Sequence, residues 1–331
     1  MNQPHLSQQQ GYLLFSLTYA NLFHFPLKAS ECVHYAPLDT VPEAEILDDL
    51  TTLKKMGLVA EMDGYYCLPN RTDLIAARKN KMEIVDRLNA KTHRLARVLF
   101  PFEWIRCVLL SGSLAYGNPS DGRDDIDFFL VVAKNRVWVT HYFLRLLKAL
   151  TGNSQCCTNY IVSEDALELA FPNLFTALEL RNAKLIKGAS IRTNLFAENA
   201  WASDFFPSTL PSEEFELPPS MSSRLFNVLN RFWPVAWMDW LLFRWVVFRS
   251  RGNYAPSRST FKPHSPQRQL ALFQTLLDNF SGAMREALPQ WVEHIESEIL
   301  HLKQALVLWE SGQSMAPLFK TRKKPCPANP N

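Results

Sequence analysis

The chain has 331 residues, of which 47% are hydrophobic and 20% charged, and this composition excludes a wholly disordered protein. Lysine and arginine (35) nearly balance aspartate and glutamate (32), so the formal charge of +3 neither favours nor excludes nucleic acid. No apolar run reaches the roughly 18 to 20 uncharged residues of a membrane-spanning helix, so none is expected.

The first 70 residues predict a small helical unit that ends in a β-hairpin. Apolar residues recur three and four positions apart, which predicts helices over 10–23, 28–35 and 43–56. Asp63-Gly64 then separates two short alternating runs, a strong hairpin signal. Three helices followed by a hairpin is the pattern of a winged helix, which we assign to residues 1–70.

The third of these helices disfavours DNA binding, although a winged helix suggests it. This expected recognition helix has only two basic residues against four acidic ones, and acidic residues oppose contact with phosphates. The residues are Lys54 and Lys55 against Glu43, Glu45, Asp48 and Asp49. Docking to a protein or dimerisation is the alternative role that we favour.

The rest of the chain divides into five segments. Residues 71–100 predict a long connecting helix with a basic exposed side. Residues 101–206 alternate strands and helices, with strands expected over 105–110, 126–132 and 156–162, a helix over 136–150 and a helix over 164–185 that is broken near Pro172. A linker over 207–219, a helical domain over 220–310 and a loosely ordered tail over 311–331 follow. Within the helical domain, helices are expected over 222–248, 266–279 and 286–309.

The most informative stretch lies within residues 108–132. A buried strand runs into Gly112-Ser113, where the glycine lets backbone N–H groups approach a phosphate and the hydroxyl adds a donor. Asp125 and Asp127 lie two apart at the start of the next strand and so project from one face. Because such carboxylates repel each other unless a cation lies between them, the spacing predicts a metal site facing a phosphate cradle.

This motif resembles the signature of the nucleotidyltransferase superfamily, which includes DNA polymerase beta, kanamycin nucleotidyltransferase and the minimal antitoxin-type nucleotidyltransferases. Eleven residues separate Gly112-Ser113 from Asp125-Ile126-Asp127, and the resemblance covers about a third of the chain, residues 101–205. It implies a mixed sheet, two Mg²⁺ (or Mn²⁺) ions and attack on the α-phosphate of a nucleoside triphosphate. It further implies that Ser113 contacts the β- and γ-phosphates and that Asp125 and Asp127 hold metal.

One departure concerns the third carboxylate that active members carry on a later strand. The corresponding strand here offers Asn159, an amide that cannot act as a base. The nearest acids, Glu164 and Asp165, follow that strand and are candidates to assist catalysis. Because of this departure the sequence does not decide whether the site catalyses the transfer, although nucleotide binding does not depend on the third carboxylate.

A purely structural role for the acidic residues is the alternative to a metal site. Asp121, Asp124 and Asp125 could serve in turns or caps after the Asn-Pro-Ser segment. Asp127 fits this alternative poorly, because a lone carboxylate in an apolar strand is costly without a partner. We choose Asp125 over Asp124, since only Asp125 shares a strand face with Asp127.

The chain is therefore expected to be an α+β protein with a central nucleotidyltransferase-type mixed sheet, an N-terminal winged-helix-like domain and a C-terminal helical domain. The favoured function is Mg²⁺-dependent transfer of AMP from ATP to a small molecule or a protein. The alternatives are an impaired relative that senses nucleotide or binds DNA or a protein partner as a regulator, and an antitoxin-like role that modifies a partner protein.

Two further expectations concern the surroundings of the protein. The six cysteines form no C-x-x-C pair and the first residues show no secretory signal, so a reducing, cytoplasmic setting is expected. Four tryptophans near Arg244, Arg249 and Arg251 favour a helix interface, with peripheral contact to an anionic membrane as the alternative. These tryptophans are Trp233, Trp237, Trp240 and Trp245.

Overall fold

A mixed β-sheet lies at the centre of the computed structural model, which describes residues 5–38, 41–152, 155–169, 171–206, 234–250, 256–261, 266–311 and 313. The strands lie in the order β7-β4-β5-β6-β8. They are β4 (Ile105–Ser111), β5 (Ile126–Val132), β6 (Cys156–Ser163), β7 (Lys184–Lys187) and β8 (Thr260–Phe261). Only the pair β5 and β6 is parallel, and the other neighbours are antiparallel. The expectation of an α+β protein with a mixed sheet and flanking helices is thereby confirmed at this level.

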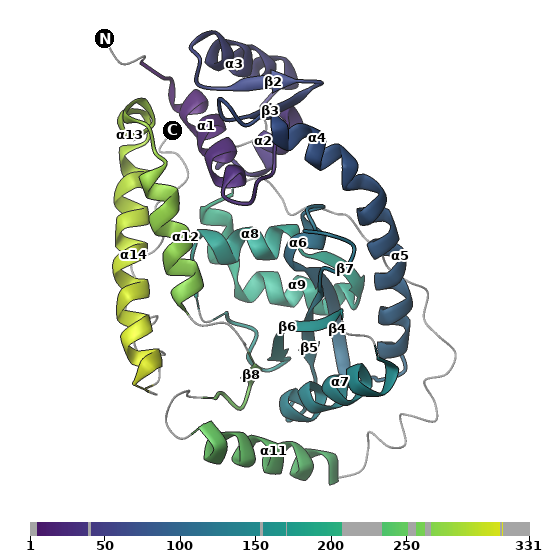
Figure 1. Cartoon of the computed structure of the whole chain (residues 1–331). Coiled ribbons are helices and arrows are strands. Elements are labelled where there is room, and N and C mark those ends of the chain that lie inside the picture. Colours follow the sequence, from purple (N-terminus) through teal and green to yellow (C-terminus); the bar gives the residue numbers. More distant parts are fainter. Residues whose placement is uncertain are drawn as a thin grey trace.

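Helices cover both faces of this sheet (Figure 1). They are α5 (Met82–Leu99) and α7 (Val137–Thr151) on one face, and α8 (Leu174–Asn182) and α9 (Ala189–Glu198) on the other. The alternation of side chains along β4 explains the two layers, because Val108 and Leu110 pack toward α5 and α7 while Cys107 and Leu109 pack toward α8 and α9. A sheet covered on both faces needs mostly apolar residues on its inner strands, and β4 and β5 meet this need: apart from Arg106, Ser111 and Asp127, all of their residues are apolar and buried.

The N-terminal unit contains three helices and a small antiparallel sheet of order β1-β3-β2. In chain order its elements are α1 (Gln8–Asn21), β1 (Leu27–Lys28), α2 (Ala29–His34), α3 (Glu43–Lys55), β2 (Ala60–Met62) and β3 (Tyr65–Cys67). The predicted hairpin is confirmed, with both Asp63 and Gly64 at the positive φ that the tight two-residue turn requires.

The predicted connecting helix is present as two helices, α4 (Asp73–Asn80) and α5, with Lys81 between them. Several of its basic side chains have partners, so they do not form one solvated charged face. Arg78 makes two bonds to Glu31 of the N-terminal unit, of 2.6 and 2.7 Å, and Lys79 pairs with Asp63 at 2.5 Å. These contacts attach α4 to the N-terminal unit.

The C-terminal helices pack on the N-terminal unit and on the sheet. They are α11 (Pro234–Ser250), α12 (Pro266–Asp278), α13 (Gly282–Ala287) and α14 (Pro289–Glu310). Residues of α12, α13 and α14 share one buried core with α1, α3 and α8, whereas α11 packs along α7 (Figure 1). None of the described helices combines the length and the apolar character needed to cross a bilayer.

One expected element differs from the structure. Residues 164–185 were expected to be helical with a break near Pro172, but of the residues described there only those of α8 are helical, and strand β7 begins at Lys184, with its Leu185 and Ile186 buried beside β4. Asn173 begins α8 by accepting a hydrogen bond from the Thr176 N–H, so the helix starts after Pro172. The predicted linker 207–219, the start of the helix predicted at 222–248 and almost all of the tail lie outside the described residues.

Candidate active site

Gly112 brings the end of β4 against Asp127 of the neighbouring strand. Ser111 pairs with Asp127 in the antiparallel register, and Gly112 then opens the single helical turn α6 (Gly112–Ala115). Gly112 has a φ of +68°, and any Cβ at this position would collide with the Asp127 carboxylate. Glycine is the residue that tolerates this positive φ and has no Cβ to meet Asp127. The backbone at Gly112 therefore lies directly beside the Asp127 carboxylate.

The Asp127 carboxyl group is held in a partly desolvated position. Burial raises its pKa to about 6, the Cys157 thiol opposes that shift by donating a hydrogen bond, and the negative charges of Asp125 and Asp124 reinforce it. The same interactions raise the pKa of the Cys157 thiol, first through burial and then through the charge of Asp127. A carboxylate in this environment favours a cation beside it.

The two other aspartates of the motif have different surroundings. Asp124 Oδ2 accepts hydrogen bonds from the Ser113 hydroxyl and the Ser120 N–H, both at 2.8 Å, which makes Asp124 a turn-forming residue. Asp125 precedes β5, is exposed and, like Asp127, lines the adjoining cavity. Asp125 and Asp127 are thus brought to one cavity, while Ser113 is bonded to Asp124.

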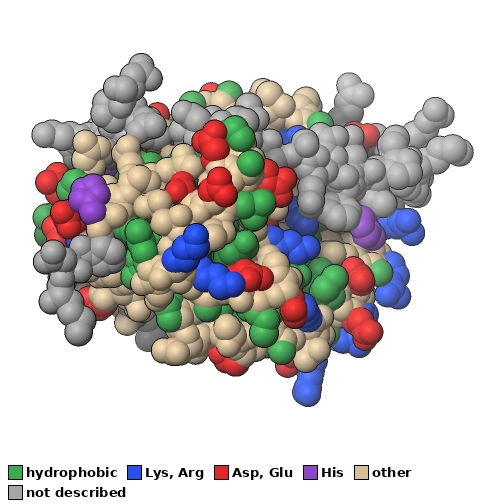
Figure 2. All heavy atoms as spheres, turned by 90° about the horizontal axis from the view of Figure 1, so that it is seen from above, with side chains coloured by type: hydrophobic (Ala, Val, Ile, Leu, Met, Phe, Trp, Pro, Cys, Tyr) green, Lys and Arg blue, Asp and Glu red, His purple; other side chains and the backbone are tan. Residues whose placement is uncertain are grey.

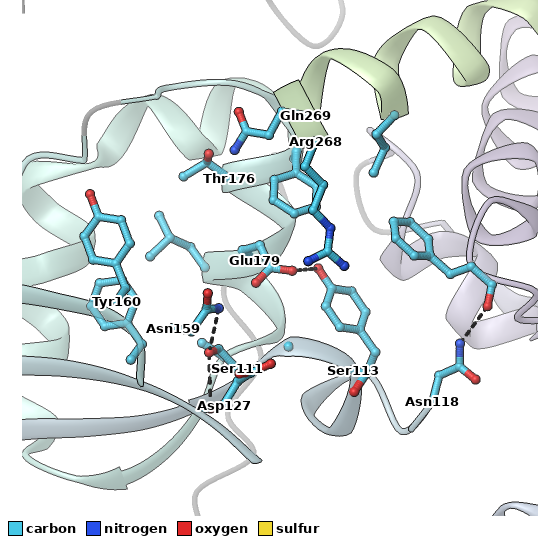
Figure 3. A pocket seen from close by; sticks show the side chains of 18 of the residues that line it. Ser111, Ser113, Asn118, Asp127, Asn159, Tyr160, Thr176, Glu179, Arg268 and Gln269 are labelled. Carbon is cyan, nitrogen blue, oxygen red and sulfur yellow. Dashed lines mark hydrogen bonds between the residues drawn. The ribbon is translucent and has the colours of Figure 1, made fainter. Parts of the chain in front are cut away.

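Asn159 lies on β6, the strand on which the resemblance of the motif led us to expect a third carboxylate. Its Nδ2 donates to Ser111 Oγ at 3.2 Å, and Ser111 Oγ in turn donates to the backbone carbonyl of Asp127 at 3.2 Å (Figure 3). The amide therefore contacts the serine turn and lines the cavity, where it offers hydrogen bonds and no negative charge.

Glu164 and Asp165 are not brought to the cavity. They follow the far end of β6, whereas Asp127 pairs with Cys157 near its beginning. Glu164 pairs with Arg106 at 3.1 Å, and Asp165 pairs with Lys134 at 3.0 Å. About six residues of extended strand, roughly 20 Å, separate these acids from Asp127, so we assign them no role in the cavity.

The cavity measures about 500 Å³ and is lined by several parts of the chain, α8 among them. The sheet and α6 supply Gly112, Ser113, Asp125 and Asp127, α1 and the residues after it supply an aromatic wall, and α12 closes a further side. Ligand sites in proteins have volumes of this order and combine apolar walls with a few polar groups.

A second cluster of polar side chains lies in the same cavity, and the sequence analysis did not predict it. Glu179 of α8 accepts a hydrogen bond from the Tyr116 hydroxyl at 3.1 Å, and Arg268 extends from α12 into the cavity on the side of Glu179 (Figure 3). The positive charge of Arg268 acts on Asp127 as well, since it lowers the pKa of that carboxyl. Arg268 thus faces both acidic parts of the cavity.

Two buried hydroxyl groups line this part of the cavity without a hydrogen-bond partner among the described residues. They are Tyr19 Oη and Thr176 Oγ1. Thr176 lies one turn before Glu179 on α8, so the two side chains share a helix face. Unpaired buried hydroxyls are costly, and a polar ligand in the cavity would supply the missing partners.

An aromatic wall separates this polar group from the N-terminal core. The rings of Tyr35 and Tyr116 stack with centroids 6.1 Å apart, and those of Tyr19 and Tyr35 stack at 6.5 Å. Burial raises the pKa of Tyr35 and Tyr116, and the charge of Glu179 adds to both shifts. Both phenols therefore stay protonated and act as hydrogen-bond donors.

The metal-binding capacity of the site rests on two carboxylates. No group of three His, Cys, Asp or Glu side chains suited to hold a metal ion occurs in the described part of the chain. Mg²⁺ is commonly bound by one or two carboxylates together with water and substrate phosphates, so Asp125 and Asp127 fit an ion that arrives with a nucleotide.

A signal for some of the missed residues is present in the sequence. Thr176 and Glu179 are polar positions three apart in the largely apolar helix LFTALELRN. For Arg268 and Tyr19 no local signal exists, because tertiary packing alone brings α12 and α1 to the cavity. Comparison of the chain with protein-family models, with curated proteins and with solved structures finds no match to any of them.

Proposed function

We propose that the cavity binds a nucleoside triphosphate with Mg²⁺ and that the protein transfers a nucleoside monophosphate, with AMP from ATP favoured, to an acceptor. The observation that carries the proposal is the close approach of Gly112 to Asp127, which puts a phosphate-compatible backbone turn beside a partly desolvated carboxylate in the cavity. This arrangement agrees with the nucleotidyltransferase resemblance of the motif, and so does the mixed sheet.

Asp125 and Asp127 would hold the metal ion together with oxygens of the triphosphate. When bound, the ion would neutralise charge on the attacking and leaving oxygens of the transfer. Gly112 leaves room for the triphosphate to approach the backbone, and the Ser113 hydroxyl, bonded to Asp124 at 2.8 Å, can turn to donate to a phosphate oxygen.

The acceptor would bind at the other polar part of the cavity. Glu179 can accept a proton from a hydroxyl or ammonium group, a task that Asn159 cannot perform. Tyr19 and Thr176 offer unpaired hydroxyls to the same molecule, and Arg268 supplies positive charge between acceptor and phosphates. These groups favour a small acceptor that carries hydroxyl or amino groups.

The alternative function is nucleotide sensing without transfer, and Asn159 is the observation that favours it. With the amide in place of the third carboxylate, the site would hold Mg²⁺ and nucleotide through Asp125 and Asp127 and release no pyrophosphate. The regulatory output would then pass to the N-terminal unit, whose Tyr35 lines the cavity.

For the N-terminal unit we propose a winged-helix-like docking module. The element order α1-β1-α2-α3-β2-β3 supports this proposal. Figure 2, which views the molecule from the end where α3 lies, shows acidic and basic side chains interspersed on that face. A mixed surface of this kind suits a protein partner better than a nucleic acid.

The experiment measures Mg²⁺-dependent ATP binding by calorimetry and pyrophosphate release with candidate hydroxylated or amino acceptors. We expect Asp127→Asn to abolish both, and Glu179→Gln to abolish release while binding stays within about threefold. Release that survives Asp127→Asn would refute the transfer mechanism. Tight ATP binding without release from any acceptor would favour the sensor.

A matched pair of glycine variants separates the local clash from backbone strain. Gly112→Ala and Gly117→Ala both place alanine at positive φ, +68° and +72°, but only at residue 112 does the new Cβ meet Asp127. Each variant should lose roughly 1 kcal/mol or more of stability from strain alone. Only Gly112→Ala should also lose ATP binding, and equal loss in both variants would contradict the proposed cradle.

A further inference from the structure

Apolar side chains lie on every side of the helix α11, but the described residues pack against one side of it. On the side that faces α7 and the sheet, Leu242, Phe243 and Val246 are partly buried and Asp239 is fully buried. A helix that is apolar all round is normally covered on all sides. No element of the described part of the chain packs on the opposite side of α11, and Figure 1 shows α11 at the end of the molecule away from α3.

Large apolar side chains concentrate on this side. Of the 17 that are exposed in the described part of the chain, nine belong to these two helices, two on α7 and seven on α11. We call the following set the α7–α11 face: Leu146, Leu150, Trp237, Met238, Trp240, Leu241, Trp245, Val247 and Phe248. Phe248 is 84% exposed and Leu150 is 75% exposed, so the face is open to its surroundings.

The two helices present this face as one continuous surface. They run parallel, because Asp239 accepts from the Trp138 N–H at 2.8 Å and, further along, the Tyr142 and Trp245 rings meet edge to face at 5.8 Å. Leu146 and Leu150 lie one and two turns beyond Tyr142 on α7 and extend the same surface.

The charge of the face is uniformly positive. The exposed charged residues of the two helices, within their described parts, are Arg145, Arg244 and Arg249, and the single acidic residue, Asp239, is buried. Arg244 lies over the Trp240 ring at 5.8 Å and Arg249 over the Trp245 ring at 5.2 Å. Tryptophan beside arginine on an apolar helix is typical of segments that lie in the headgroup region of a bilayer.

A second copy of the chain fits this face less well than an anionic surface does. A symmetric dimer would bring the same patch from both copies together and so place arginine near arginine with no acid on either side. An anionic bilayer matches both the positive charge and the apolar character of this face, because its headgroups neutralise the arginines and its acyl region accepts the aromatic rings.

We propose that the α7–α11 face binds the surface of anionic membranes, with Trp237, Leu241 and Phe248 inserted among the acyl chains and Arg244 and Arg249 at the headgroups. The first three residues follow one line along α11, spaced four and seven apart. This membrane contact is independent of the transfer reaction and would position the protein beside a bilayer without a spanning helix.

The test is co-sedimentation of the full-length chain with vesicles of phosphatidylcholine alone or mixed with phosphatidylglycerol. We expect binding to the mixed vesicles and weak binding to phosphatidylcholine. Trp237→Gln and Phe248→Gln should each lower partitioning about tenfold. Arg244→Gln and Arg249→Gln should each lower it about fivefold, with a smaller response to salt.

The matched control replaces exposed apolar residues on a different surface. Leu300 and Val307 of α14 are 57% and 65% exposed, so Leu300→Gln with Val307→Gln removes similar apolar area and should leave vesicle binding unchanged. Circular dichroism and the unfolding midpoint of every variant establish that the fold is kept, as exposure of these side chains predicts.

Three outcomes would overturn the proposal. They are absence of binding to the mixed vesicles, an equal loss of binding in the α14 control, and a dimer in light scattering that Trp237→Gln dissociates while vesicles bind nothing. Because none of these measurements involves ATP, a result that overturns membrane binding does not bear on the proposed transfer reaction.

Discussion

Asp127 is the single residue at which stability and the proposed function conflict most directly. Burial holds its pKa at about 6 against an ordinary value of 3.8, so the folded chain favours the protonated carboxyl while metal binding requires the charged one. A group whose pKa is raised by folding contributes a stability that is present below pH 4 and lost as the pH rises through 6.

This conflict predicts a pH-dependent gain in stability for Asp127→Asn. Above pH 7 without divalent ions, the variant should be more stable than the wild type by up to about 3 kcal/mol, because the amide removes a desolvated charge. At pH 4 the two proteins should unfold alike. Urea unfolding across this pH range measures the difference in unfolding free energy between the variant and the wild type. A difference that does not vary with pH would show that the carboxyl is not desolvated.

At the scale of the helices and strands, one buried carboxylate connects α11 to α7 through hydrogen bonds. Asp239 accepts hydrogen bonds from the Trp138 and Val139 N–H groups at 2.8 and 2.9 Å, where the first turn of α7 leaves its backbone donors unpaired. Burial raises the pKa of Asp239, and these backbone bonds oppose the shift. One side chain therefore caps α7 and attaches α11 to it.

Asp239→Ala should lower the free energy of unfolding by about 2 kcal/mol and loosen α11, because two buried N–H groups lose their acceptor. Urea unfolding measures the loss, and limited proteolysis within α11 measures the loosening. Asp239→Asn is the control, since its amide oxygen can still accept and should preserve most of the stability. If Asp239→Ala leaves protease resistance unchanged, the apolar stripe of α11 alone suffices for docking.

At the scale of the whole molecule, the two ends of the chain share a core. Trp291 of α14 packs on Phe15 of α1 with ring centroids 5.0 Å apart and on Phe205 at 6.2 Å, and its side chain is buried. One apolar core includes residues of α1, α3, α12, α13 and α14. We therefore expect these elements to unfold together.

Trp291→Ala should cost about 3 to 5 kcal/mol and increase amide exchange in α1 as well as in α14, because the cavity it leaves borders both helices. Hydrogen exchange followed by mass spectrometry resolves the two segments. Trp240→Ala, at an exposed position of α11, should change stability by less than about 1 kcal/mol. Faster exchange in α14 with α1 unaffected would mean that the two ends fold independently.

The parts of the fold that local patterns determine were predicted well. The helices α3 and α7 end just before Gly57 and Gly152, which both have positive φ, and β5 spans the predicted residues 126–132. Strand β7 was missed because four residues carry no readable periodicity, and pairing with β4 overrides the helical pattern of the preceding segment.

The candidate site was predictable in part. The sequence motif led to Gly112, Asp125 and Asp127, because strand register alone brings these residues together. The bond from Ser113 to Asp124 depends on the turn between α6 and β5, which no spacing rule resolves. Glu179 and Arg268 come from other segments, so only the tertiary fold reveals them.

The cavity has walls from α1, the sheet and α12, and this origin has a mechanical consequence. A molecule lodged there would act as a strut between the first and last portions of the polypeptide and would resist their separation. A fragment that lacked α1 or α12 would lose one wall of the cavity beside Gly112 and Ser113. Occupancy of the cavity would therefore couple α1 to α12.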